Sequence, residues 1–187
     1  MDDLINYIED KDVFINKDWY YHGSSFSYDN YINILTNGLL APYWIKDNNS
    51  SYKYIFLAHA SDNKYSSFYN HSIYPNFIIN NSIPAININD SFIKKFIYNG
   101  FYGLKFTSLY KDEYQVYKII NKEDIIGIIY NIDKLINNYE NKSNYYFNIL
   151  YDLFILLDEL KIDIPIIDYY TRKEINKKKV LTLGKRN

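Results

Sequence analysis

The sequence predicts a mixed α and β fold in a single domain. Strand-like apolar segments occur at 54–58, 113–120 and 125–130, whereas apolar residues recur at helical spacing in 28–37 and 143–160. A chain of 187 residues fits one domain better than two. With 48% hydrophobic and 23% charged residues, the composition is that of a globular protein rather than a disordered one.

Local signals define the two helices. Ser27 is a suitable N-cap for a helix over 28–37, Gly38 suits the position after its last turn, and Pro42 prevents its continuation. The helix over 143–160 carries an apolar stripe that predicts a face buried in the core, formed by Tyr146, Ile149, Leu150, Leu153, Leu157 and Leu160.

Weaker signals cover the rest of the chain. Segment 1–10 is predicted to form a short helix, because Leu4, Ile5 and Ile8 share one helical face. Segments 13–21 and 73–95 are expected to be extended, the latter with intervening loops. The polar stretch 46–53 is expected to be a loop, and 60–70 a helix or turn.

Charge is distributed unevenly along the chain. The formal net charge is -1, but the last 17 residues carry seven Lys or Arg and one Glu, a local charge of +6. We therefore expect a single domain over 1–170 and a basic C-terminal tail over 171–187. Such a tail is either a solvated segment or a docking segment for an acidic partner or a nucleic acid.

Composition excludes several classes of protein. The balanced charge argues against a nucleic-acid or membrane-surface binder that works by bulk positive charge. No apolar run approaches the ~18 residues of a membrane span, so no membrane association is expected. The absence of cysteine excludes disulfides, thiolate catalysis and Cys-ligated zinc. Three histidines leave little material for a metal site. The acidic N-terminus MDDLINYIED does not resemble a signal peptide, so a cytoplasmic location is expected, in the protein's own cell or in a host cell after delivery.

Three segments combine residue types that suggest a common site. The first is WYYHGSS at 19–25, a strand ending in His-Gly-Ser and followed by the 28–37 helix. The second is the strand YIFLA at 54–58, followed by SSFY at 66–69. The third is DEYQVY at 112–117, in which an acid opens a strong strand.

In order and spacing these segments resemble the His-Tyr-Glu class of ADP-ribosyltransferases, which includes the poly(ADP-ribose) polymerases and diphtheria toxin. The resemblance runs from Trp19 to about Gly127. It implies an α+β, ADP-ribosyltransferase-like fold of two packed, mostly antiparallel sheets with flanking helices. It also implies NAD as a substrate, bound between the sheets.

The resemblance implies a role for each matching residue. His22 would hydrogen-bond the adenine-side ribose, while Gly23, followed by Ser24, would let backbone groups clamp the nicotinamide carboxamide. Glu113 would be the catalytic residue. It would hold the ribose 2′-hydroxyl and stabilise the oxocarbenium-like charge that develops when the glycosidic bond breaks.

The second segment matches less closely. Ser66 and Tyr69 fit the family pattern if two residues are inserted after the strand, and Tyr69 would then stack on nicotinamide. The family's triad tyrosine falls on Phe56, which can stack but lacks the hydroxyl. Tyr54 lies on the same strand face and would replace that tyrosine only after a register slip of two.

Related classes fit less well. The Arg-Ser-Glu class places an arginine on an early strand, and this chain has no arginine before Arg172. That class also carries an acid or amide two residues before its catalytic Glu, whereas Gln115 follows Glu113.

We therefore expect transfer of a single ADP-ribose from NAD to an acceptor, most simply a protein side chain, although a nucleic-acid acceptor stays open. A toxin, an effector or a phage- or virus-associated modifier would suit a free-standing transferase of this size. The alternatives are an NAD glycohydrolase and a catalytically degenerate NAD-fold module that binds a partner.

Overall fold

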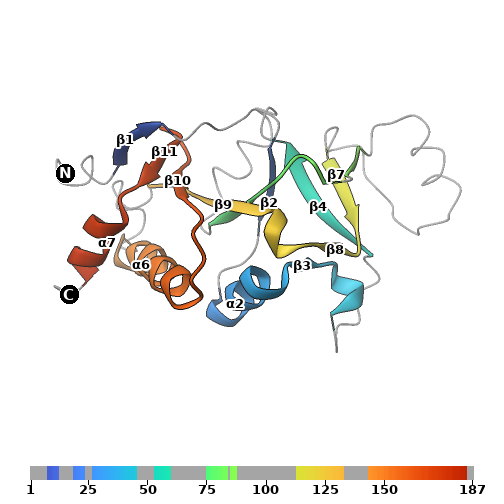
Figure 1. Ribbon diagram of the computed structural model, residues 1–187, viewed down its shortest axis with the longest axis horizontal. Helices are drawn as coiled ribbons and strands as arrows, with labels where there is room; N and C mark the ends of the chain where they lie inside the picture. Colours follow the sequence, from blue (N-terminus) through green and yellow to red (C-terminus); the bar gives the residue numbers. More distant parts are fainter. Residues whose placement is uncertain are drawn as a thin grey trace, which may run out of the picture.

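The computed structural model describes residues 8–12, 19–23, 27–45, 53–59, 75–83, 85–87, 113–132 and 143–184 (Figure 1). The strands there are β1 (Ile8–Asp12), β2 (Tyr20–Gly23), β3 (Leu39–Leu40), β4 (Tyr54–His59), β5 (Asn76–Ile79), β6 (Ile86–Asn87), β7 (Glu113–Tyr117), β8 (Ile119–Ile120), β9 (Ile125–Tyr130), β10 (Ile166–Asp168) and β11 (Lys173–Ile175). The helices are α2 (Tyr28–Asn37), α6 (Ser143–Glu159) and α7 (Lys177–Gly184), with the 3-10 turns η1 (Pro42–Trp44) and η2 (Lys122–Asp124).

The strands form one large sheet and one small one. The large sheet has nine strands in the order β1-β11-β10-β9-β5-β2-β4-β7-β6, and the small one pairs β3 with β8. The ladders of the large sheet are antiparallel except for the parallel pair β9 and β10. The expectation of a mixed α and β fold with mostly antiparallel strands is therefore confirmed. The expected packing of two sheets on each other is not shown, because nine of the eleven described strands form one sheet.

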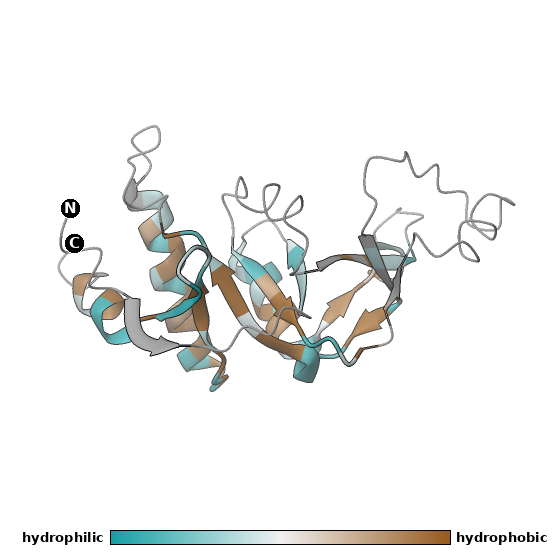
Figure 2. Cartoon of the chain, turned by 90° about the horizontal axis from the view of Figure 1, so that it is seen from above, coloured by the Kyte–Doolittle hydropathy of each residue, from teal (hydrophilic) through white to brown (hydrophobic). Residues whose placement is uncertain are grey.

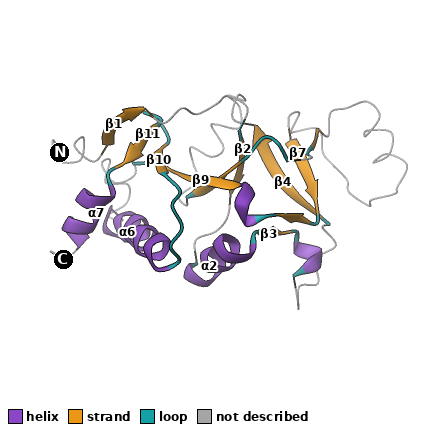
Figure 3. Cartoon of the chain, viewed as in Figure 1, coloured by secondary structure: helices purple, strands orange, loops and turns teal. Residues whose placement is uncertain are grey.

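The two faces of the large sheet differ in what covers them. Figure 3 shows α2, α6 and α7 together on one side of the strands. On this side, which we call the helix face, Tyr20, Leu57, Phe77 and Ile128 pack with residues of α2 and α6 in the main core. The opposite side, which we call the far face, has a smaller cluster formed by Tyr21, Ile78, Ile129, Ile167 and Tyr169. Figure 2 shows hydrophobic residues along the central strands and α6.

Helix α2 has the ends that its sequence predicts. The Ser27 side chain accepts a hydrogen bond from the backbone N–H of Asn30 at 3.2 Å, which caps the first turn. Gly38 follows the last turn with φ 87°, and its N–H donates to the carbonyl of Ile34. The bounds expected for this helix are confirmed, as are those of β9.

Two expectations about secondary structure are wrong in part. Residues 8–10 were expected to be helical but belong to β1, which pairs with β11 near the other end of the sequence. The segment 113–120 is not one strand, because Lys118 adopts a left-handed conformation with φ 69° that separates β7 from β8. Each difference depends on pairing or on backbone geometry that apolar spacing does not report.

The basic C-terminal segment, expected to be either a solvated tail or a docking segment, is folded over 173–184. Strand β11 pairs with β10 and β1 within the sheet, and α7 packs on α6. Val180 of α7 is fully buried and Ile175 of β11 is nearly so. The basic residues within 173–184 therefore belong to folded elements rather than to a free tail.

Candidate functional site

The described parts of the three segments that carry the resemblance lie on three neighbouring strands. The His-Gly segment forms β2, the segment that begins at Tyr54 forms β4, and Glu113 opens β7. The sheet order places these strands side by side as β2-β4-β7. Segments that are far apart in the sequence are thus brought together in the fold.

The ladders align particular residues of these strands. Tyr21 pairs with Ala58, which pairs in turn with Glu113, and Phe56 pairs with Gln115. Directly paired residues share one face of a sheet, and residues two apart on a strand also share it. By register, these five positions all belong to the far face.

Strand β2 is paired on both sides over Tyr20 and Tyr21 but only with β5 over His22 and Gly23, among the described strands. Within the described strands, its ladder with β4 ends at Tyr21, whereas its ladder with β5 runs on to Gly23, which pairs with Asn76. Neighbouring residues of a strand direct their backbone groups to opposite sides. Either His22 or Gly23 therefore directs its N–H and C=O toward the β4 side, beyond the end of the β2–β4 ladder.

His22 does not share the register of Glu113. It is half-buried and pairs with Phe77, whose ring is fully buried in the main core. It is therefore placed on the helix face, whereas the register position of Glu113 is on the far face. The resemblance assigns both residues to one NAD site, where they would face each other across the cleft. Their register positions on opposite faces of the sheet speak against that arrangement.

Arg172 lies on the far face beside β2. Its Nη1 donates a hydrogen bond of 2.8 Å to the hydroxyl of Tyr21, and its guanidinium lies 4.8 Å from the centre of the Tyr169 ring. Burial raises the pKa of Tyr21, although the charge of Arg172 partly opposes this rise. The sequence singled out Arg172 only as one of two arginines, since nothing local links it to a strand 151 residues away.

The buried carboxylate of Asp168 fixes the turn that presents Arg172. It accepts hydrogen bonds from the backbone N–H and hydroxyl of Thr171, both at 2.8 Å, and from the N–H of Ile132 at 3.2 Å. The Asp168 carbonyl accepts from the N–H of Arg172, whose φ is 60°. This network holds the residue in a conformation that non-glycine residues rarely adopt.

Asn76 places a buried amide next to Gly23. It is 3% exposed, and its Oδ1 has no hydrogen-bond partner among the described residues. A buried polar atom without a partner costs about 1–3 kcal/mol, so such atoms commonly mark the place of a water or a ligand donor. By register Asn76 shares the far face with Gly23. No local sequence signal distinguishes Asn76 from the many other asparagines of the chain.

The other predicted site residues are only partly described. Ser24, Ser66 and Tyr69 lie outside the described residues, and so do the side chains of Phe56 and Glu113. Tyr54 is half-buried, and its ring packs edge-on against Tyr117 with 5.5 Å between ring centres.

The described residues include neither a candidate metal site nor a candidate membrane-spanning helix. They contain no group of three His, Cys, Asp or Glu side chains placed to hold a metal ion. No helix in the described part of the chain is long and apolar enough to cross a membrane.

Comparison with known proteins adds no relative. No family model, curated protein or solved structure matches the chain. The fold and the candidate site define an α+β protein whose three motif-bearing strands are adjacent.

Proposed function

We propose that this chain transfers ADP-ribose from NAD to an acceptor and releases nicotinamide, using an ADP-ribosyltransferase-like fold. The observation that carries the proposal is the adjacency of β2, β4 and β7, the three strands that bear the resemblance. The resemblance itself rests on residue types, their order and their spacing, so the pairing of these strands is an independent observation.

The proposed reaction breaks the bond between the ribose C1′ and the nicotinamide nitrogen. Nicotinamide leaves with the bonding electrons, the acceptor forms a bond to C1′, and the proton of the acceptor is released to solvent. Glu113, at its far-face position, stabilises the positive charge on the ribose as the bond breaks. The acceptor is a protein side chain in the simplest form of the proposal, with one ADP-ribose transferred.

Two features beside β2 support a nicotinamide position at its end. Gly23 is exposed and lacks a side chain, which permits the close approach of a ligand to backbone. Its neighbour Asn76 has the buried Oδ1 described above, an acceptor suited to the N–H donor of a carboxamide. In this proposal His22 lies on the helix face at the end of β2.

One incubation separates this proposal from its alternatives. The protein is mixed with NAD and a cell lysate, and both free nicotinamide and labelled acceptor are measured. Transfer produces both, an NAD glycohydrolase produces nicotinamide alone, and a catalytically degenerate module binds NAD and produces neither. Heterogeneous product ladders on a gel would indicate polymer rather than single transfer.

The catalytic role is tested by Glu113→Gln. We expect transfer to fall by about 10²–10³ while NAD affinity is largely kept, because the amide retains the shape and loses the charge. The exposed Glu123 of η2 provides the matched control, Glu123→Gln, which should leave activity unchanged. Gly23→Trp should instead weaken NAD binding itself. Full transfer activity in Glu113→Gln would contradict the assignment.

A cytoplasmic site of action, and a role as a toxin, effector or phage- or virus-associated modifier, belong to the same proposal. They are tested by locating the protein in its source cells and by expressing it in host cells. A secreted, cleaved precursor would contradict the cytoplasmic location.

A further inference from the structure

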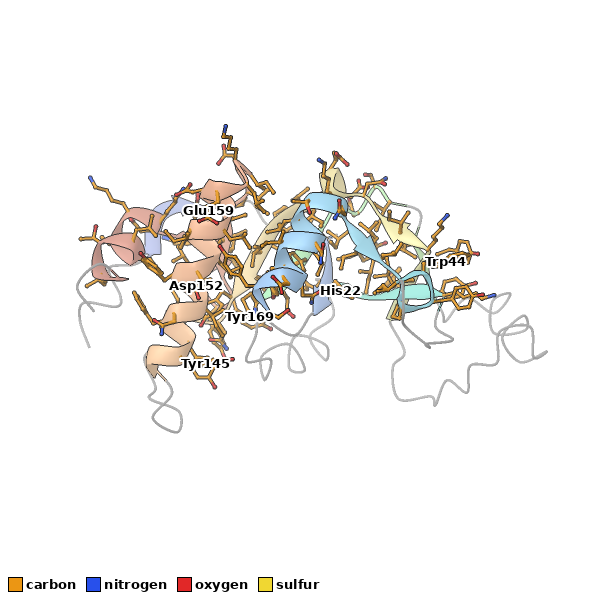
Figure 4. The ribbon with its side chains drawn as sticks, turned by 90° about the horizontal axis from the view of Figure 1, so that it is seen from below. His22, Trp44, Tyr145, Asp152, Glu159 and Tyr169 are labelled. Atoms are coloured by element: carbon orange, nitrogen blue, oxygen red, sulfur yellow. The ribbon has the colours of Figure 1, made fainter. Side chains whose placement is uncertain are left out.

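Large apolar side chains are exposed together at one end of the sheet. Among the described residues, the exposed apolar side chains at this end are Leu40, Tyr43, Trp44, Ile45, Tyr117 and Ile119. Tyr117 is 51% exposed, Tyr43 45% and Trp44 37%. Figure 4 shows Trp44 at the end of the molecule away from Tyr145, Asp152 and Glu159 of α6.

The aromatic rings at this end contact one another. The ring centres are 4.9 Å apart for Tyr43 and Trp44, 6.2 Å for Trp44 and Tyr117, and 5.5 Å for Tyr54 and Tyr117. All three contacts are edge-to-face. Two lysines lie over ring faces, Lys53 at 4.8 Å from the Tyr43 centre and Lys118 at 5.2 Å from the Trp44 centre. We call the four rings and two lysines of these contacts the aromatic–lysine surface: Tyr43, Trp44, Lys53, Tyr54, Tyr117 and Lys118.

Backbone hydrogen bonds tie the three segments of this surface together. The N–H of Ala41 donates to the carbonyl of Lys118 at 2.8 Å, and the N–H of Lys118 donates to the carbonyl of Lys53 at 3.1 Å. Lys118 also has the left-handed φ of 69°. Such a conformation in a non-glycine residue costs free energy and is often found at functional sites. The rings and lysines are thus held on a fixed frame.

The charge of this surface has one sign. The segments 40–45, 53–54 and 117–119 contain two lysines and no Asp or Glu, in a chain whose net charge is -1. A ligand that matches both features carries flat apolar rings and regularly spaced negative charges. Unpaired nucleotides have both, because each base offers a ring face and each nucleotide a phosphate.

We propose that the aromatic–lysine surface binds single-stranded nucleic acid. Bases stack on the rings of Trp44, Tyr43 and Tyr117, while Lys53 and Lys118 swing on their flexible stems to the phosphates. A duplex is a poorer ligand, since its base faces are already stacked on one another. The proposal does not depend on the transferase activity, although Tyr54 and Tyr117 share the far face with the register position of Glu113.

Binding is tested on the full chain without NAD. Fluorescein-labelled 16-nucleotide oligo(dT) and oligo(U) are titrated and followed by fluorescence anisotropy, with a duplex of mixed sequence as a comparison. Trp44→Ala and Tyr117→Ala should each weaken binding by about 5- to 150-fold, the range expected for loss of one stacked base. Tyr145→Ala, at a residue 47% exposed on α6, is the control and should leave binding unchanged.

The lysines are tested by the salt dependence of binding. Each phosphate contact to single-stranded nucleic acid contributes about -0.7 to the slope of log K against log salt concentration. Lys53→Gln and Lys118→Gln should each make the slope shallower by about that amount. Lys178→Gln, at an exposed lysine of α7, should not change it.

Stacking also has a fluorescence readout that leaves the residues of the aromatic–lysine surface unchanged. The chain has two tryptophans, so Trp19→Phe leaves the emission of Trp44 alone, and bound oligonucleotide should quench it. Equal affinity for the duplex, loss of binding in Tyr145→Ala, or unchanged binding in both aromatic variants would overturn the proposal. So would equally tight binding of a Glu-rich peptide, which would indicate simple ion exchange.

Discussion

Gly38 is the residue at which a single methyl group should most clearly destabilise the fold. Its φ of 87° and ψ of 179° lie in a region that is essentially restricted to glycine, and a non-glycine residue there costs about 1–3 kcal/mol. A Cβ at this position would lie 2.2 Å from the carbonyl oxygen of Ile120 and 3.0 Å from the backbone nitrogen of Lys122. Neither of these backbone atoms can move away as a flexible side chain would.

The size of the effect follows from adding strain and overlap. Moving β8 and η2 away from the new methyl group resembles overpacking of a core, which costs about 1–3 kcal/mol. Gly38→Ala should therefore lower the free energy of unfolding by about 2–6 kcal/mol. For a chain of this length that corresponds to a fall in Tm of about 4–24 °C.

Urea unfolding followed by circular dichroism measures the loss as a shift in midpoint at unchanged slope. Asn37→Ala is the neighbouring control, since Asn37 is exposed and helical, and its replacement should change stability by about 0.5 kcal/mol or less. If Gly38→Ala is as stable as this control, the conformation assigned to the end of α2 is wrong.

Three further predictions concern stability, each measured by urea unfolding. Leu153→Ala should cost about 2–5 kcal/mol, because the Leu153 side chain is fully buried beneath the sheet, and a cost below 1 kcal/mol would contradict that burial. Ser27→Ala should cost about 1 kcal/mol by removing the cap of α2, while Ser27→Gly should cost much less. Burial raises the pKa of Asp152, so the folded state binds this proton more tightly than the unfolded state and loses stability as pH rises through the raised pKa. Asp152→Asn should therefore be more stable than the parent at pH 7 but not at pH 3, and an equal gain at both values would refute the assignment.

The parts of the fold that depend on neighbouring residues could be predicted from the sequence. Helix α2 follows from Ser27, the spacing of Tyr31, Ile34 and Leu35, and Gly38, all of which act within a few residues of the helix. The apolar segment at 125–130 likewise became β9 with the expected bounds. Propensity and capping are local, so sequence alone reports them.

Other parts required knowledge of the folded chain. Residues 8–10 have the spacing of a helix, but β11 supplies backbone partners that turn them into a strand. The helix-face position of His22 follows from its pairing with Phe77, which no motif encodes. Sequence order suggested the neighbourhood of His22, Phe56 and Glu113, and only the ladders assign each residue to a face of the sheet.

The residues missed near the site had no local signal. The contact between Arg172 and Tyr21 spans 151 residues, and the missing partner of Asn76 Oδ1 is a property of its surroundings. The aromatic–lysine surface was hidden for a different reason. Tyrosine is so abundant in this chain, with 23 residues, that a cluster of rings is visible only in three dimensions.

The position of β1 at the edge of the sheet has a consequence for biosynthesis. Among the described strands, β1 pairs with β11 alone and β11 is attached to the sheet through β10. Strand β1 can therefore join the sheet only after these two later strands have been made. At about 5–20 residues per second, the ribosome needs roughly 8–32 s to go from the end of β1 at Asp12 to the start of β11 at Lys173. During that interval the nascent chain carries an unpaired strand that is open to misassociation. Early termination of translation after β9 would release a product in which β1 has no place to dock.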